Sequence, residues 1–304
     1  MSFKNAVKLL LSKFRYVWAI LAYLTVMFIV LLSLGLTFLL PVFRAFASAG
    51  VGDMLNTALI TFLNGGTILG LFTAFGEVLV TVKNIFATDS RTFVNSMLFV
   101  VLVATVAYRF IMGLYELPLV SVIQGFMSDN ARYSYMTKYV SFFGMSVRFS
   151  LVKMLVMTIY DSVMYYLMFC IAKLCGTISV ILAPTILSFT LLVFLSFRYT
   201  LISAWSPAMV VEGKKIFPSL GFSIRHAFRH FGSLFSLFFI VWLIAVALNV
   251  FVGVFTFGVG LLVSVPVTMF FINLVNMTFY YGRTGKNYYV DGTVFNPEVR
   301  KKQQ

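Results

Sequence analysis

Four ionisable side chains lie inside long apolar runs of the sequence, namely Arg109, Glu116, Asp161 and Arg198. A charge in a bilayer costs about 3 kcal/mol or more unless it is paired or hydrated. At about 1.5 Å per helical residue, Arg109 and Asp161 fall at similar depths in successive runs. We therefore predict two structural ion pairs, Arg109–Asp161 and Glu116–Arg198. The alternative is a polar intramembrane site in which these residues hold an anionic headgroup or a coupling ion.

Other residue types that could do chemistry are sparse. His226 and His230 are four residues apart, a spacing that metal sites use, but no Cys, Asp or Glu close by in the sequence completes a ligand set. Cys170 and Cys175 fit small apolar positions of a membrane helix. The sequence has no Gly-rich phosphate loop, no HExxH and no GxSxG. We therefore expect no metal, no cofactor and no enzymatic activity.

The composition requires lipid as the surrounding solvent. The chain of 304 residues is 61% hydrophobic and only 11% charged, with a mean hydropathy of +0.99. A soluble domain could not bury that much apolar surface. The net charge is +14, and the positive charges flank apolar runs, as topology signals and contacts with anionic lipid do. Nucleic acid is not an expected partner, because the sequence shows no reader motif or basic groove.

The order of apolar and polar segments predicts an all-α polytopic membrane bundle. One membrane domain covers residues 1–281, and a basic cytoplasmic tail covers 282–304. The predicted spans are 16–40, 93–117, 149–172, 178–204, 232–257 and 258–281. The predicted connections are an interfacial helix at 2–14, an outer amphipathic insertion at 41–92, a cytoplasmic segment at 118–148 and a cytoplasmic amphipathic segment at 205–231.

The insertion at 41–92 is apolar enough to be mistaken for a span. Its apolar and polar residues form separate stripes at helical spacing, and Gly65-Gly66 interrupts it. We therefore predict two amphipathic helices at about 53–64 and about 67–86. If it crossed the membrane, every later segment would change sides. The cationic segment 205–231 and the tail would then face outward, against the preference of Lys and Arg for the cytoplasm. Both termini are therefore predicted to be cytoplasmic.

Two of these connections are basic and amphipathic. In residues 2–14, Phe3, Leu10 and Phe14 share an apolar stripe, and in the second half of 205–231 the stripe is Leu220, Ile224, Ala227, Phe228 and Phe231. Helices of this kind lie on the membrane surface. The candidate contacts with anionic lipid on the cytoplasmic side are Lys4, Lys8, Lys214, Lys215, Arg225 and Arg229.

The layout resembles a set of bacterial membrane families. The similar residues are Pro207-Ala208-Met209-Val210-Val211-Glu212-Gly213-Lys214 and Ser219 to His230. The resemblance is to the membrane domain found ahead of some glycerophosphodiester phosphodiesterases and to free-standing six-helix relatives. Residues 125–131, Gly-Phe-Met-Ser-Asp-Asn-Ala, are similar to relatives from Firmicutes. The resemblance implies a six-helix fold in a bacterial plasma membrane, and it implies no chemistry, because the phosphodiesterase domain is absent from the sequence.

Two functions follow as hypotheses. The first is a non-catalytic membrane protein that binds lipid or a protein partner whose identity stays open. The second is a transporter or permease component for a lipid-like or small polar solute. A weak internal repeat favours transport, since Phe143-Gly144 and Phe231-Gly232 each follow a polar stretch that begins at a proline.

Overall fold

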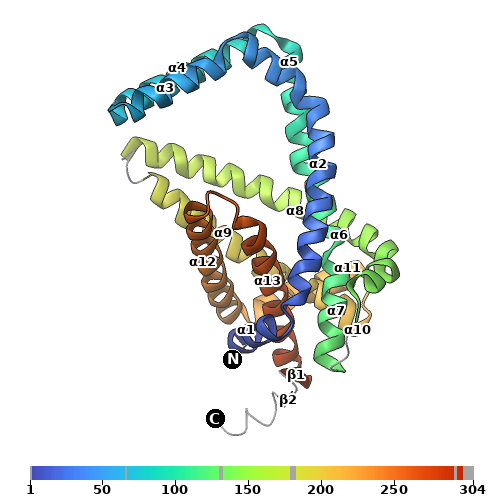
Figure 1. The fold of residues 1–304 in the computed structure, drawn as a ribbon. Coiled ribbons are helices and arrows are strands. Elements are labelled where there is room, and N and C mark those ends of the chain that lie inside the picture. Colours follow the sequence, from blue (N-terminus) through green and yellow to red (C-terminus); the bar gives the residue numbers. More distant parts are fainter. Residues whose placement is uncertain (1, 66, 130–132, 179–182, 291–292, 297–304) are drawn as a thin grey trace. The chain divides into compact units, whose positions relative to one another are not determined.

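A computed structural model describes residues 2–65, 67–129, 133–178, 183–290 and 293–296, and nearly all of them are helical (Figure 1). The predicted tail residues 297–304 lie outside the described residues. The elements are α1 Ser2–Ser12, α2 Arg15–Ser48, α3 Val51–Leu63, α4 Ile68–Thr88, α5 Ser90–Leu98, the π-helix η1 Phe99–Ala107, α6 Tyr108–Leu114, α7 Glu116–Ser128, α8 Tyr135–Ile178, α9 Ala183–Ile202, α10 Trp205–Glu212, α11 Ile216–Arg229, α12 Phe231–Phe255, α13 Leu261–Thr284, β1 Tyr288–Val290 and β2 Thr293–Phe295.

Within the described residues, six helical segments are long and apolar enough to cross a membrane. They are Arg15–Ser48, Ser90–Ser128, Tyr135–Leu174, Thr185–Glu212, Phe231–Phe255 and Leu261–Thr284. These segments correspond in order to the six predicted spans, so the predicted all-α polytopic fold is confirmed. The chain is a multi-pass membrane protein.

Several predicted boundaries differ from the structure. The first span does not end at Pro41, because α2 continues through this proline to Ser48. A proline removes only one backbone hydrogen bond, and an otherwise strongly helical apolar stretch tolerates that loss. The predicted cytoplasmic segment 118–148 is divided between α7, which is almost entirely buried, and the first turns of the 44-residue α8.

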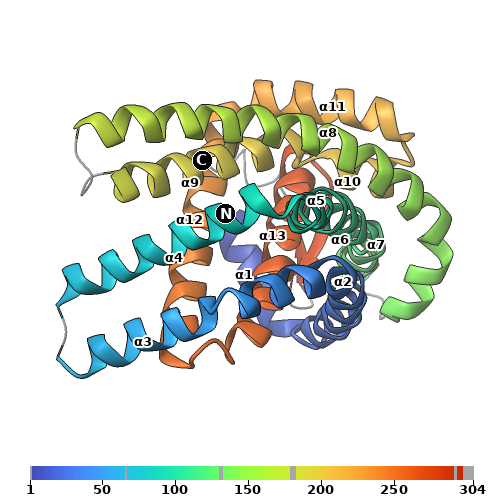
Figure 2. The ribbon, with the colours of Figure 1, turned by 90° about the horizontal axis from the view of Figure 1, so that it is seen from above.

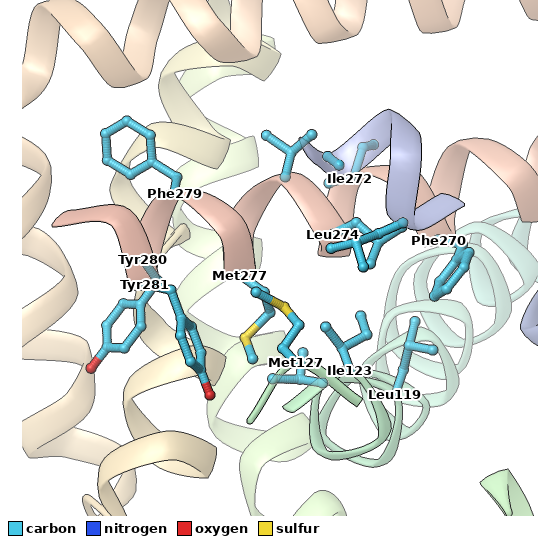
Figure 3. Close-up of a cluster of buried hydrophobic side chains, with 14 of the residues drawn as sticks. Leu119, Ile123, Met127, Phe270, Ile272, Leu274, Met277, Phe279, Tyr280 and Tyr281 are labelled. Carbon is cyan, nitrogen blue, oxygen red and sulfur yellow. The ribbon is translucent and has the colours of Figure 1, made fainter. Parts of the chain in front are cut away.

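The chain forms two compact units, and the larger comprises residues 1–25 and 110–304. Its core is centred on α13, whose inner positions are buried from Phe270 to Tyr281. Figure 3 shows Leu119, Ile123 and Met127 of α7 projecting toward the face of α13 that carries Met277. The core is apolar. Where its side chains would otherwise contact water, their burial stabilises the fold by about 25 cal/mol per Å² of apolar surface.

The larger unit also contains helices whose backbones approach each other closely. At Gly113 of α6 an added Cβ atom would lie 3.0 Å from the Cα atom of Ser150 in α8, and the Ser150 hydroxyl donates to the Phe110 carbonyl. A glycine is required here because no side chain fits between the two backbones. In both ribbon views α8 and α9 run alongside each other (Figure 2).

The smaller unit, residues 26–109, contains the predicted insertion. Helices α3 and α4 pack against each other as a hairpin, as the prediction of two helices in this region required (Figure 1). Gly50 and Gly65 adopt positive φ angles of 70° and 95° at the turns before and after α3, which glycine adopts readily. A cavity of about 320 Å³ lies between the two helices and is lined by Thr57, Thr61 and Glu77, among other residues.

The start of the predicted polar tail is part of the folded domain. Helix α13 extends to Thr284, and β1 and β2 then pair as an antiparallel hairpin. Tyr288 of β1 is 2% exposed, and its hydroxyl accepts a hydrogen bond of 2.7 Å from the Asn5 amide of α1. Helix α1 is thereby attached to the C-terminal end of the domain.

Candidate functional site

The charged side chains of the spans form ion pairs, but Glu116 and Arg198 each have a partner other than the predicted one. Glu116 of α7 pairs with Lys153 of α8, and both side chains are largely buried. Asp161 of α8 accepts hydrogen bonds from the Arg198 Nη1 atom of α9, at 3.1 Å and 3.0 Å to its two oxygens. The predicted pair Glu116–Arg198 is therefore wrong, because Lys153 of α8 pairs with Glu116 and Arg198 pairs with Asp161.

Lys153 was missed by sequence reasoning because it lies only four residues into the predicted span 149–172. A lysine at that position looks like an interfacial residue whose amine extends to water. Its contact with Glu116 depends on how α7 and α8 pack, which the sequence pattern does not contain. Arg109 belongs to the smaller unit, so its pairing with Asp161 stays a prediction.

The second candidate site is the polar turn that leads into α11. Gly213 has a φ of 64° at the end of α10, and the Trp205 indole donates to the Ile216 carbonyl at 3.0 Å. The Ser223 hydroxyl donates to the Leu201 carbonyl at 2.7 Å and accepts from the Ala204 amide at 3.2 Å. These bonds satisfy backbone groups where α9 ends and attach α11 to the end of the fourth span.

Helix α11 packs inward through small residues. Ser219, Ser223 and Ala227 are fully buried and follow one another at four-residue intervals. Phe217 and Phe228 are 69% and 66% exposed. The predicted apolar stripe is therefore divided: Ala227 is buried and Leu220 packs against a buried cluster, whereas Ile224, Phe228 and Phe231 are exposed. Exposed large apolar side chains on one face of a helix mark a surface for contact with protein or membrane.

The outward stripe of α11 is bordered by positive charge. Arg225 and Arg229 are exposed on the flank of the helix next to Phe228, and Lys215 is exposed at its N-cap. Lys214 differs from these three candidates, because its ammonium group forms an ion pair of 2.6 Å with Glu212 and lies 3.7 Å from the centre of the Phe222 ring. We call Lys215, Arg225, Arg229 and the exposed Phe217, Ile224 and Phe228 the α11 outer face.

Helix α1 has a similar organisation. Ala6 and Leu9 are buried, and the helix packs on α13, where the Thr278 hydroxyl donates to the Ser2 carbonyl at 3.2 Å. The candidates Lys4 and Lys8 are exposed. Leu11 is 72% exposed close to them. Both surface helices therefore present lysine or arginine together with large apolar side chains.

An aromatic cluster connects α11 to the end of α13. His226 stacks on Phe222 at a ring separation of 5.8 Å and lies 6.1 Å from Phe279 and 6.4 Å from Tyr280. Figure 3 shows that Phe279 projects from the side of α13 opposite to Tyr281. The Tyr280 hydroxyl donates to the Glu212 carboxylate, a contact that the sequence pattern could not reveal because the two residues are 68 positions apart.

Burial and neighbouring positive groups act on His226. Burial, followed by the effects of His230, Arg283 and Arg229, lowers the pKa of His226 to about 4. The imidazole is therefore neutral at physiological pH. The rings of His226 and His230 are 4.9 Å apart, but no group of three metal-ligating side chains occurs among the residues that the structure describes.

Comparison of the chain with protein-family models, curated proteins and solved structures found no match. The predicted resemblance to bacterial six-helix membrane families therefore stays a prediction, and the proposals below rest on the residues themselves.

Proposed function

We propose that this protein is a non-catalytic component of a bacterial plasma membrane that binds anionic phospholipid at the cytoplasmic surface. The observation that supports the proposal most is the α11 outer face, where exposed aromatic side chains lie beside exposed arginines. The aromatic side chains enter the boundary between headgroups and acyl chains, and the arginines attract phosphate groups. Each Lys or Arg near an anionic surface contributes about 1 kcal/mol.

The predicted topology places these helices on one membrane side. An even number of spans separates α1, α11 and the tail, so all three lie on the same face of the membrane. The excess of Lys and Arg there favours the cytoplasm. Anionic lipid is the partner that this charge distribution fits, and the identity of any protein partner stays open.

A transport function is less well supported than lipid binding. Transport of a polar solute would require the charges of the spans to face a hydrated cavity. Pairing of Glu116 with Lys153 and of Asp161 with Arg198 favours a role in holding α7, α8 and α9 together.

The proposal is tested by extracting the protein with its surrounding lipid in polymer nanodiscs and measuring the lipid composition by mass spectrometry. We expect enrichment of anionic phospholipid over the bulk membrane. A variant replaces four exposed basic residues by glutamine, namely Lys4, Lys8, Lys215 and Arg225. We expect the lipid composition around this variant to equal that of the bulk membrane.

The matched control replaces exposed basic residues from the predicted opposite side, Arg44, Lys83, Arg91 and Lys173. This control removes the same charge and should leave the enrichment unchanged. A wild-type composition equal to the bulk membrane, or equal effects of the two variants, would contradict the proposed function.

A further inference from the structure

Three helix ends meet next to the α11 outer face. The ring contacts of His226 with Phe279 and Tyr280 place the last turns of α11 against the last turns of α13. Helix α12 begins at Phe231, and only His230 separates it from the end of α11 at Arg229. Since α12 and α13 are both candidate spans, this corner lies where a span leaves the apolar layer, at the level of lipid phosphate groups.

The corner concentrates positive charge. Arg283 of α13 donates from Nη2 to the Ser233 hydroxyl of α12 at 3.2 Å, and its guanidinium lies 5.2 Å from the centre of the Phe279 ring. These two contacts hold the guanidinium in position. Arg229 and Arg283 are close enough to His226 to lower its pKa, so both arginines lie at the same corner.

No carboxylate of the described residues forms an ion pair with Arg229 or Arg283. The Glu212 carboxylate, which contacts Tyr280 of α13, is already engaged by Lys214 and Tyr280. Part of the positive charge is explained locally, because arginine is favoured where α11 and α13 end. That preference acts on each helix separately and does not explain why two such ends are placed together.

The first turn of α12 adds neutral donors. No side chain caps this turn through its N-cap residue His230, and its first backbone N–H groups have no partner within the helix. Ser233 is exposed in this turn and contributes a hydroxyl. Two guanidinium groups, a hydroxyl and a helix N-terminus together match the oxygens of a phosphate group.

We propose that Arg229, Arg283 and Ser233 form a binding site for the phosphate group of an anionic phospholipid. This inference rests on the proposed function and assigns the lipid binding to a defined place in the structure. A lipid fits better than free phosphate, because Phe228 and Phe231 are 66% and 36% exposed beside the site and can contact acyl chains.

The site is tested on the full chain in detergent by native mass spectrometry with added phosphatidylglycerol. The variant Arg229→Gln/Arg283→Gln should bind the lipid about tenfold more weakly, as expected when charge-assisted hydrogen bonds are lost. The matched control is Lys83→Gln/Arg91→Gln, which removes the same charge at exposed positions on the predicted opposite side of the membrane. It should change the affinity by about twofold or less.

The outcomes separate this site from the proposed function. Equal weakening by the two variants, with wild type still preferring phosphatidylglycerol over phosphatidylcholine, would overturn the site and leave general anionic-lipid binding intact. No preference in the wild type would overturn both. Displacement of bound phosphatidylglycerol by inorganic phosphate at equal concentration would identify a free-phosphate site and overturn the lipid inference. A fatty acid binding as tightly as phosphatidylglycerol would overturn recognition of phosphate.

Discussion

At the scale of single residues, the four charged side chains Glu116, Lys153, Asp161 and Arg198 of the spans have partners that explain their positions. Glu116 and Lys153 are both largely buried. A buried ion pair contributes little net stability compared with apolar residues of the same shape, but loss of one partner leaves the other charge uncompensated. We therefore expect the pair to determine how α7 and α8 pack more than it adds to stability.

Lys153→Met should destabilise the protein by about 3–5 kcal/mol, because it leaves the Glu116 carboxylate buried without its ion-pair partner. Glu116→Gln/Lys153→Met should recover most of that loss, since it removes both charges. The measurement is thermal unfolding of the purified protein in detergent. Lys173→Met, at an exposed position of the same helix α8, is the control and should change stability by less than about 0.5 kcal/mol. A double variant no more stable than Lys153→Met would refute the pair.

His226 gives the stability of the domain a dependence on pH. Its pKa is about 4 in the folded protein and about 6.5 in an unfolded chain. Between these values the unfolded state binds a proton that the folded state does not, so stability falls as the pH falls through this window. His226→Gln should therefore lose less thermal stability than wild type between about pH 7 and about pH 4.5. Equal losses would show that other groups account for the acid sensitivity.

At the scale of elements, small residues determine where helices approach closely. Gly113 permits the contact of α6 with α8, and the buried Ser219, Ser223 and Ala227 permit the contact of α11 with the end of α9. The sequence predicted α11 as a basic amphipathic helix from its periodicity. It did not predict which face packs inward, because small residues provide a weak hydrophobic signal even where they are fully buried.

Gly113→Ala should destabilise the larger unit by about 1–3 kcal/mol, because the added methyl group overlaps the Ser150 backbone. Thermal unfolding measures the effect. Gly144→Ala is the control, since an added Cβ atom at this position of α8 meets no other atom within 4 Å. Alanine also favours a helix over glycine by about 1 kcal/mol, so the control should be neutral or stabilising. Similar unfolding temperatures for the two variants would contradict the close crossing.

At the scale of the whole molecule, the six spans were predictable and their partners were not. Long apolar runs such as 232–257 report on lipid, because little of such a span is buried inside the protein, and hydropathy therefore finds them. The burial of α7 was missed because 118–148 reads as a polar connection, with Gln124 and Asp129 in it. The hairpin of β1 and β2 was missed because its contact with Asn5 joins residues 283 positions apart.

We propose that the basic surface helices face the cytoplasmic leaflet, where anionic lipid is available. Single cysteines at Arg225 and at Thr88, in a background without Cys170 and Cys175, test this claim with a membrane-impermeant thiol reagent. In intact cells we expect labelling at position 88 and protection at position 225, with position 225 labelled after lysis. Labelling at position 225 in intact cells, with position 88 protected, would place the α11 outer face on the outer leaflet and contradict the account.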